Sequence, residues 1–222
     1  MLTDAQREAI TQQLMRRRRH ADDAGSIPRR HPGLAEFPPS HGQEQLWLID
    51  RLSPGLSNYN IPQVLRLSGP LDRPALERAL GGLIARHEVL RTRLVADGQG
   101  RPVQVIDPAG RVALEVVELS GSEPARVREL ALAEAMRPFD LAAGPLLRAC
   151  LARLGEAEHL LVAVFHHAVF DGWSAGVLMR DLAALYRGEA TGEPSGLTEL
   201  PVQFADFAAW ERERLQDRKS VV

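Results

Sequence analysis

The chain has 222 residues, of which 45% are hydrophobic and 25% charged, as expected for a folded protein with one sizeable domain. Its 27 basic and 29 acidic side chains leave a formal net charge of −2, which argues against a nucleic-acid partner held by a basic surface. No apolar run has the length of a membrane span and the first residues lack the shape of a signal peptide. We therefore expect a cytoplasmic location and no membrane partner.

Residues 1–37 are predicted to form a helix followed by a linker. The pattern over 3–19 is helical, and Thr3 with Gln6 fits a capping box at its start. The stretch 20–39 contains six Pro and Gly residues and little periodicity, which is typical of a linker. We expect the compact domain to occupy residues 38–222, and the first helix is a candidate docking element for an upstream protein.

From residue 38 onward strand and helix patterns alternate, which predicts a mixed α/β domain. The strand candidates are residues 63–67, 102–106, 112–117, 146–154 and 159–165. The helix candidates are a segment opened by Asp72 and Pro74, and residues 123–136, 174–186 and 206–215. The strand at 159–165 is nearly all apolar, so we expect it in the interior of a sheet.

Cys150 is the only cysteine, so the chain can form no internal disulfide. It lies in the apolar run 146–151, where a small buried thiol is the default interpretation and a catalytic cysteine the alternative.

Two adjacent histidines follow the apolar strand, and they are the strongest candidates for chemistry. Side chains alternate along a strand, so His166 and His167 should point in opposite directions, and only one of them can line a given cavity. The other must be packed or hydrogen-bonded behind it. A histidine at this place titrates near neutrality and can accept a proton from an attacking amine or help to orient it.

Asp171 and Gly172 follow a short turn, directly before a predicted helix. The carboxylate can bind backbone N–H groups at the helix start, or an arginine elsewhere. The glycine permits positive φ or close approach of a substrate, and its amide can help to stabilise an oxyanion.

From these residues alone, acid–base catalysis and a purely structural histidine remain open alternatives. A metal site is the weakest alternative, because zinc needs three or four converging ligands. The other histidines show no metal-like spacing; they are His20, His31, His41, His87 and His159.

The segment His166–Gly172 resembles the His-His-x-x-x-Asp-Gly hallmark of the condensation-domain family of nonribosomal peptide synthetases, and Trp173-Ser174 extends the match. Further segments resemble other motifs of this family, in the same order; they are Ser40–Leu48, Arg86–Leu94, Pro138–Leu141 with Gly144–Arg148, and Gln203–Trp210. Gly42 and Gln45 depart from the usual Ala and Arg of the first motif. The resemblance covers residues 38 to about 215.

The resemblance implies an α/β (α+β) sandwich with the chloramphenicol acetyltransferase-like fold, a mixed sheet flanked by helices. Members of the family are roughly twice this length and have two lobes with a tunnel between them. The chain is therefore expected to be the N-terminal lobe, with the C-terminal lobe absent, and to be inactive when isolated.

The resemblance also implies an activity. An amine on an acceptor peptidyl carrier protein attacks a thioester on a donor carrier protein, with His167 as the catalytic histidine. Each substrate is carried on the 4′-phosphopantetheine of its carrier protein, and the lobe itself is expected to bind no cofactor. The adjacent adenylation domain and the C-terminal lobe of the parent synthetase are the other implied partners.

Around His167, the resemblance implies that five residues support the active site; they are His166, Asp171, Gly172, Trp173 and Ser174. Asp171 is implied to be structural and paired with Arg86, a pairing that would supply the charged partner that a buried carboxylate needs. The apolar residues of the flanking motifs are expected in the core; they are Leu46, Trp47, Phe204, Phe207 and Trp210.

The first motif and the segment Tyr59–Pro62 resemble the subclass that joins an L-donor to an L-acceptor. An epimerization domain is disfavoured by the first motif, and a cyclization domain would carry Asp in place of the first histidines. An alternative of another class is a non-catalytic lobe that only binds a carrier protein or serves as a structural fragment.

Overall fold

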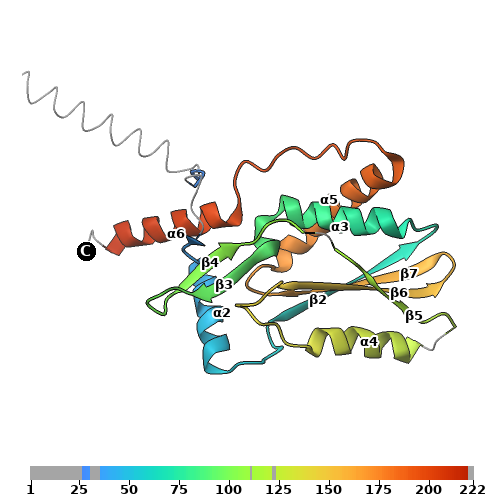
Figure 1. Cartoon of the computed structure of the whole chain (residues 1–222), viewed down its shortest axis with the longest axis horizontal. Helices are drawn as coiled ribbons and strands as arrows, with labels where there is room; N and C mark the ends of the chain where they lie inside the picture. The colour runs from blue at the N-terminus through green and yellow to red at the C-terminus, as the bar shows by residue number, and fades with distance from the viewer. Residues whose placement is uncertain (1–26, 31–35, 111, 122–123, 220–222) are drawn as a thin grey trace, which may run out of the picture.

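The computed structural model describes residues 27–30, 36–110, 112–121 and 124–219, which form two β-sheets with helices around them (Figure 1). The larger sheet has four strands in the order β2-β7-β6-β5. Their bounds are Asn60–Ser68 (β2), Glu158–His166 (β7), Leu147–Gly155 (β6) and Glu115–Glu118 (β5). Strand β7 is antiparallel to β2 and β6, whereas β5 is parallel to β6, so the sheet is mixed, as predicted.

The smaller sheet has three antiparallel strands in the order β1-β4-β3. Their bounds are Glu36–Phe37 (β1), Pro102–Ile106 (β4) and Thr92–Ala96 (β3). Strand β4 lies at the residues predicted from the sequence. Strands β1 and β3 were not predicted, because they are short and lack a clear alternation of polar and apolar residues.

Helices cover both faces of the larger sheet. In Figure 1, α3 and α5 lie together over one face, and α4 lies along the opposite face. The helix bounds are His41–Leu52 (α2), Arg73–Arg86 (α3), Pro124–Met136 (α4), Gly172–Thr191 (α5) and Phe204–Lys219 (α6), and a short 3₁₀ helix spans Glu88–Arg91 (η2). Helix α2 was not predicted, and the predicted helix at 3–19 lies outside the described residues. None of the described helices is long and apolar enough to cross a membrane.

Helix α3 forms as its sequence predicts. The Asp72 carboxylate accepts a hydrogen bond from the backbone N–H of Ala75 at 2.9 Å, and Pro74 occupies the first turn, where its missing N–H costs nothing. Its buried side chains recur at helical spacing and face the larger sheet; they are Ala75, Leu76, Ala79, Leu80 and Leu83.

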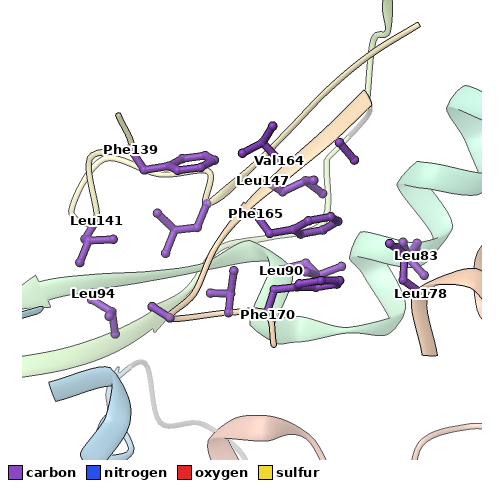
Figure 2. Packing of buried hydrophobic residues seen from close by; sticks show 14 of the residues in the cluster. Leu83, Leu90, Leu94, Phe139, Leu141, Leu147, Val164, Phe165, Phe170 and Leu178 are labelled. Carbon is purple, nitrogen blue, oxygen red and sulfur yellow. The ribbon is translucent and has the colours of Figure 1, made fainter. Parts of the chain in front are cut away.

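Strand β7 lies at the centre of the core. Seven of its nine residues are buried, which confirms the prediction of an interior strand. One of its faces packs Leu161 against α3 and α5, and nearer the carboxyl end the Phe165 ring stacks on Phe170 with centroids 4.0 Å apart. Figure 2 shows this stack between Leu147, from β6, and Leu83 and Leu178, from the helices.

Strand β2 forms one edge of the larger sheet among the described strands, with Pro62 opposite Val164 of β7. The backbone N–H of His167 donates to the carbonyl of Tyr59 at 2.8 Å, which makes this pair a hydrogen-bonded one. Because hydrogen-bonded and non-hydrogen-bonded pairs alternate along an antiparallel ladder, the nitrogen of Pro62 faces the open edge rather than β7.

The contacts of the folded unit begin before the predicted boundary at residue 38. Strand β1 pairs with β4, and the Arg29 side chain donates to the carbonyl of Pro201 at 2.6 Å. The backbone N–H of Arg30 donates to the Asp206 carboxylate at 3.0 Å. The contacts of Arg29 and Arg30 join segments 172 and 176 residues apart in the chain, so the composition of the linker alone could not reveal them.

Replacement of a core side chain on β7 should lower the free energy of unfolding strongly. Leu161 is fully buried, so Leu161→Ala should cost about 2–5 kcal/mol through lost apolar contact and a residual cavity. Urea denaturation followed by circular dichroism measures this cost. The matched control is Val64→Ala on the neighbouring strand, where the side chain is 47% exposed and the cost should be about 1 kcal/mol or less. Equal costs at the two positions would contradict the central place of β7.

Candidate functional site

The two histidines lie where β7 leaves the sheet, and backbone hydrogen bonds fix both of them. The N–H of His166 donates to the carbonyl of Leu146 beside β6 at 3.0 Å, and the N–H of His167 donates to Tyr59 beside β2. The N–H of Val169 donates a hydrogen bond to the carbonyl of His166 at 3.0 Å, which closes a tight turn. The loop that carries the histidines is therefore held from both neighbouring strands.

His167 is exposed, and its ring has a defined tautomer. Its Nδ1 lies 2.9 Å from the carbonyl oxygen of Phe170. Because a carbonyl oxygen only accepts, Nδ1 must carry the proton, and Nε2 of the neutral ring then carries the lone pair. This arrangement leaves one histidine nitrogen free to accept a proton, from a ring that the backbone holds in place.

His166 is buried, 5% exposed, on the other side of the turn. Its Nδ1 accepts a hydrogen bond from the N–H of Ala168 at 3.1 Å, so its tautomer is opposite to that of His167. Its ring lies against Tyr59 and Phe139, at centroid distances of 6.3 and 6.1 Å. Burial, together with the charge of His167, lowers the pKa of His166 to about 4, so this ring is neutral at ordinary pH. The predicted division between one accessible and one packed histidine is confirmed.

Asp171 caps helix α5. Its carboxylate accepts hydrogen bonds from the backbone N–H of Ser174 at 2.8 Å and from the Ser174 hydroxyl at 2.6 Å. Hydrogen bonds from Ser174, and the charge of His167, lower the pKa of Asp171, so the carboxylate is ionised. The sequence left open whether this carboxylate binds the N–H groups of the helix start or an arginine. The structure shows the first of these.

The predicted ion pair between Asp171 and Arg86 is wrong. The Arg86 guanidinium instead donates to Asp181, in the middle of α5, with a distance of 2.9 Å from Nε to the carboxylate. Asp171 is already satisfied by the helix that it begins, and it is exposed, so it needs no arginine. Asp181 is fully buried and does need one.

Three basic side chains donate hydrogen bonds to the Asp181 carboxylate. Besides Arg86, it accepts from His87 Nε2 at 2.8 Å and from Arg180 Nε at 2.8 Å. Burial alone would raise the pKa of Asp181, but the hydrogen bonds from Arg180, His87 and Arg86 outweigh burial and lower it. This cluster was not predicted, although Asp181 lies on the apolar stripe of α5 with Leu178 and Leu182, where a charged residue indicates a buried partner.

Gln43 ties helix α2 to the histidine loop. Ser40 and Gln43 form a reciprocal capping box, with distances of 3.1 and 3.0 Å. The Gln43 amide, 2% exposed, then donates to the carbonyl of Ala168 at 3.1 Å. It also lies 3.3 Å from the amide oxygen of Gln104 on β4. Gln43 is thus a positioning residue for the loop, and sequence reasoning assigned it no role.

A cavity of about 470 Å³ opens beside His167. It lies between helix α2 and the histidine loop, and Tyr59, Asp171 and Ser174 border it. The full lining is Ser40, Gly42, Gln43, Gln45, Leu46, Ile49, Tyr59, Val89, His167, Ala168, Val169, Phe170, Asp171, Ser174 and Phe204. Leu46 and Phe204, which were expected in the core, both line this cavity, and Leu46 also packs against the core. Gly42 and Gln45, which depart from the family pattern, also line it.

The remaining predicted supporting residues lie at the amino end of α5. The backbone φ of Gly172 is not positive, so the prediction that a glycine is needed there for a positive φ is wrong. A Cβ atom added at Gly172 would meet nothing within 4 Å. Trp173 is 86% exposed and lies outside the lining of the His167 cavity. It borders a second, smaller cavity instead.

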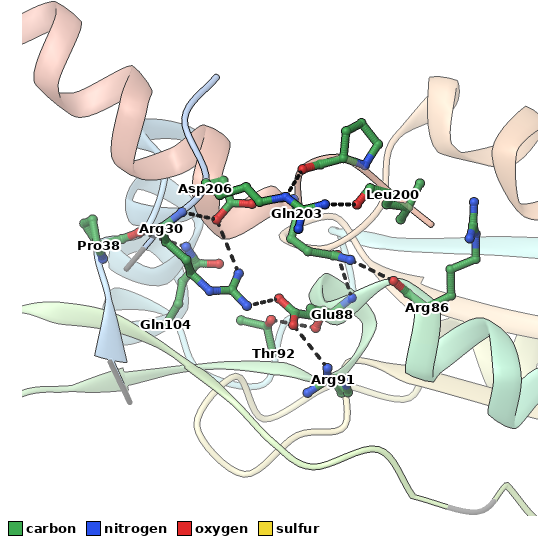
Figure 3. Close-up of polar contacts among 12 residues, drawn as sticks. Arg30, Pro38, Arg86, Glu88, Arg91, Thr92, Gln104, Leu200, Gln203 and Asp206 are labelled. Atoms are coloured by element: carbon green, nitrogen blue, oxygen red, sulfur yellow. Dashed lines mark hydrogen bonds and ion pairs between the residues drawn. The ribbon is translucent and has the colours of Figure 1, made fainter. Parts of the chain in front are cut away.

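A second polar network holds η2 and α6 together (Figure 3). Arg30 binds Glu88 at 2.5 Å and Asp206 at 3.6 Å. The Gln203 side chain accepts from the N–H of Glu88 at 3.2 Å and donates to the carbonyl of Arg86 at 3.0 Å. Residues near positions 30, 88 and 203–206 therefore depend on one another, because the loss of one charge would leave its buried partner uncompensated.

Two other chemistries find no support in the part of the chain that the structure describes. Cys150 is buried, and burial, with the charges of Glu134 and Glu115, raises its pKa to about 11, so the thiol is a poor nucleophile at neutral pH. No group of three or more His, Cys, Asp or Glu side chains there could hold a metal ion.

A double-mutant cycle distinguishes the observed partner of Arg86 from the predicted one. Arg86→Ala and Asp181→Ala should show a coupling energy of about 0.5–3 kcal/mol in unfolding free energy, because the two side chains share a buried hydrogen bond. Arg86→Ala and Asp171→Ala should be additive to within about 0.5 kcal/mol. The reverse result, with coupling to Asp171 and none to Asp181, would contradict this geometry.

His166 should make the fold less stable in acid. The folded chain holds this ring neutral down to pH about 4, whereas the unfolded chain takes up the proton near its ordinary value of 6.5. The free energy of unfolding should therefore fall as the pH drops from about 6.5 toward 4, by at most about 1.4 kcal/mol per pH unit from this group. Urea denaturation at several pH values measures the profile. The His166→Asn variant, which does not titrate, should show a shallower fall, and parallel profiles would contradict the prediction.

Comparison with known proteins agrees with the resemblance. Residues 35–221 match the family model described as Condensation domain. The chain is 44% identical over 199 residues to phosphinothricin tripeptide synthetase PhsC of Streptomyces viridochromogenes, covering 87% of this chain and 18% of that protein. It is 46% identical over 197 residues to chondramide synthase cmdD of Chondromyces crocatus, covering 86% of this chain and 5% of that protein.

Solved structures share the fold. The X-domain in its complex with OxyB from teicoplanin biosynthesis gives a TM-score of 0.78 at 32% identity, covering 87% of this chain and 41% of that one. The first condensation domain of the CDA synthetase gives 0.73 at 26% identity, covering 83% and 46%. The chain thus spans less than half of these solved chains and a small part of the synthetases that it matches. With the match over residues 35–221 and these identities, the chain belongs to the condensation-domain family of nonribosomal peptide synthetases.

Proposed function

We propose that the chain is the N-terminal lobe of a two-lobed condensation domain that forms an amide bond. The donor is an acyl thioester and the acceptor is an aminoacyl thioester, each held on the 4′-phosphopantetheine of a peptidyl carrier protein. The observation that carries the proposal is the exposed His167 ring, which is fixed through Nδ1 to the Phe170 carbonyl and lines a cavity of about 470 Å³. The lobe itself is proposed to hold no cofactor.

The proposed reaction is an aminolysis. The acceptor nitrogen attacks the thioester carbon of the donor, the C–N bond forms, and the C–S bond breaks. The nitrogen loses a proton to Nε2 of His167, and that proton then passes to the departing thiolate. A fixed imidazole serves this purpose as a base or by holding the amine in line with the carbonyl, and orientation alone supplies a large part of such accelerations.

The surroundings of His167 support this role. Gln43 and Tyr59 hold the loop from two sides through the Ala168 carbonyl and the His167 N–H. His166 packs behind the loop as a neutral ring and so adds no competing charge. Asp171 is an ionised carboxylate on the cavity wall, which favours an approaching ammonium group.

We further propose the L-donor, L-acceptor subtype, supported by the segment Tyr59–Pro62 and by the form of the first motif. Tyr59 lines the cavity, and Asn60 lies opposite His166 in the sheet. The partners proposed are a donor and an acceptor carrier protein, the adjacent adenylation domain and the second lobe.

A second candidate is a lobe of a non-catalytic binding module. One observation favours it, because the chain is similar to an X-domain whose structure was solved in complex with OxyB. The candidates differ in what the histidine does. Removal of His167 should slow product formation by an amide-forming domain strongly, whereas it should leave binding by a non-catalytic module unaffected.

His167→Ala in the two-lobed protein should lower the rate of amide formation from two loaded carrier proteins by about 10²–10⁴-fold, because the fixed imidazole is lost. Product formation is followed by mass spectrometry of the acceptor carrier protein. Thermal unfolding should change little, since the side chain is exposed.

Two controls accompany this measurement. His41→Ala removes a histidine from α2 that does not line the cavity, and it should keep the rate. The 222-residue chain alone should give no amide, because about half of a two-lobed tunnel is missing from a chain that covers 41–46% of the similar solved structures. An undiminished rate in His167→Ala would contradict the proposed role of the histidine.

A further inference from the structure

A second cavity, of about 110 Å³, lies between the carboxyl end of α3, the short helix η2 and the first turns of α5. Its walls are mostly apolar, from Leu83, Val89, Phe170, Val177 and Leu178. The indole of Trp173, 86% exposed, borders it. A single exposed apolar side chain is normal on a protein surface, but here it flanks an apolar cavity beside a reaction site.

This cavity, called the side-chain pocket below, adjoins the His167 cavity. Four residues line both of them, namely Val89, Val169, Phe170 and Ser174. Phe170 also supplies the carbonyl that holds His167 Nδ1. A substrate whose reacting atom lies at His167 is therefore close to residues that also line the side-chain pocket.

The size of the side-chain pocket fits a branched aliphatic group. A cavity of about 150 Å³ lined by Leu, Ile and Phe side chains accepts a benzene molecule. The side-chain pocket is somewhat smaller, with a wall of the same kind, so it suits a side chain the size of that of valine or leucine. His87 also borders it, but Nε2 of that ring is engaged by Asp181, which holds the ring in place.

The charge of the His167 cavity favours the acceptor on this side. Among the described residues that line the His167 cavity, Asp171 is the only carboxylate, and no arginine or lysine takes part. A carboxylate there stabilises the α-ammonium of an acceptor and opposes the negative charge that develops on a donor carbonyl. Asp171 lies between His167 and Ser174 in the chain, and Ser174 belongs to both cavities.

We propose that the side-chain pocket receives the aliphatic side chain of the acceptor amino acid, whose α-amine lies between Asp171 and His167. The proposal rests on the proposed function, because it assumes an aminoacyl acceptor at His167. Val89, Val177 and Trp173 then determine which side chains fit, and they act on selectivity rather than on the chemical step.

The first experiment uses the 222-residue chain with stable probes. Leucyl-pantetheine and glycyl-pantetheine are prepared with an amide in place of the thioester, and binding is followed through the indole N–H signal of Trp173 in ¹H–¹⁵N spectra. The leucyl probe should bind about tenfold more tightly or better, since each buried CH₂ contributes roughly fourfold in affinity. Equal dissociation constants, or an unmoved Trp173 signal, would overturn the proposal.

Substitutions in α5 test the place of binding. Val177→Phe fills the side-chain pocket and should bring the leucyl-to-glycyl ratio close to one. Met179→Phe is the matched control, because Met179 is 48% exposed on the same helix and lines neither cavity; it should keep the ratio. Val177→Ala, which enlarges the side-chain pocket without risk of overpacking, should shift the preference toward a phenylalanyl probe. If the leucyl-to-glycyl ratio is unchanged in both Val177 variants, the proposed location is refuted.

A blocked amine separates acceptor from donor. N-acetyl-leucyl-pantetheine lacks the ammonium group, so it should bind more weakly than the free amine, by about tenfold. Tighter or equal binding of the acetylated probe would assign the side-chain pocket to the donor and overturn the proposal as stated.

Turnover by the two-lobed protein keeps this inference apart from the proposed function. If amide forms and Val177→Phe lowers the leucyl-to-glycyl ratio of kcat/KM, both are supported. If amide forms and the ratio does not change, only the side-chain pocket is refuted. If the unsubstituted protein forms no amide with either acceptor, the proposed function is refuted. The dissociation constants of the leucyl and glycyl probes then show whether the side-chain pocket binds an aliphatic side chain.

Discussion

Strand β7 lies between β2 and β6 and is buried on both faces over most of its length, so its side chains reach solvent only where the strand ends. The orientations of the two histidines and the start of helix α5 depend on where this strand ends. The alternation of the strand sends His166 into the core against Phe139 and leaves His167 exposed. The turn that follows then returns a carbonyl to the His167 ring and starts helix α5 at Asp171.

Side chains from distant parts of the chain fix this short loop and the helices around it. Gln43 reaches it from α2, 125 residues away in sequence, and its amide is nearly inaccessible to solvent. The carboxylate of Asp181 fastens the carboxyl end of α3 to α5. The Arg30 network joins η2 to α6. Each of these contacts is polar and largely buried, so its geometry matters more than its strength, because a displaced partner would leave an unsatisfied group in the interior.

The sequence allowed accurate predictions at several places where a local rule decides the outcome, although helix α2 was missed despite its capping box. The apolar run of β7, the Asp72 cap of α3 and the opposite orientations of His166 and His167 all follow from periodicity or capping. The partner of Arg86 was predicted wrongly, because residues 171 and 181 are both acidic and only tertiary packing shows which of them is buried. The same holds for Gln43, whose role depends on a carbonyl far along the chain, and for β3, whose pairing with β4 is not indicated by a clear alternation.

Pro62 has a consequence for how such a sheet meets other chains. The outward-facing nitrogens of β2 belong to residues 60, 62, 64, 66 and 68, and the one at position 62 carries no hydrogen. A strand that tried to add itself along this edge would find one of these donors missing and so could not build a continuous ladder. With the long side chains of Gln63 and Arg66 beside it, the proline disfavours edge-to-edge aggregation of a chain whose exposed surface already carries Leu52, Met136 and Trp173.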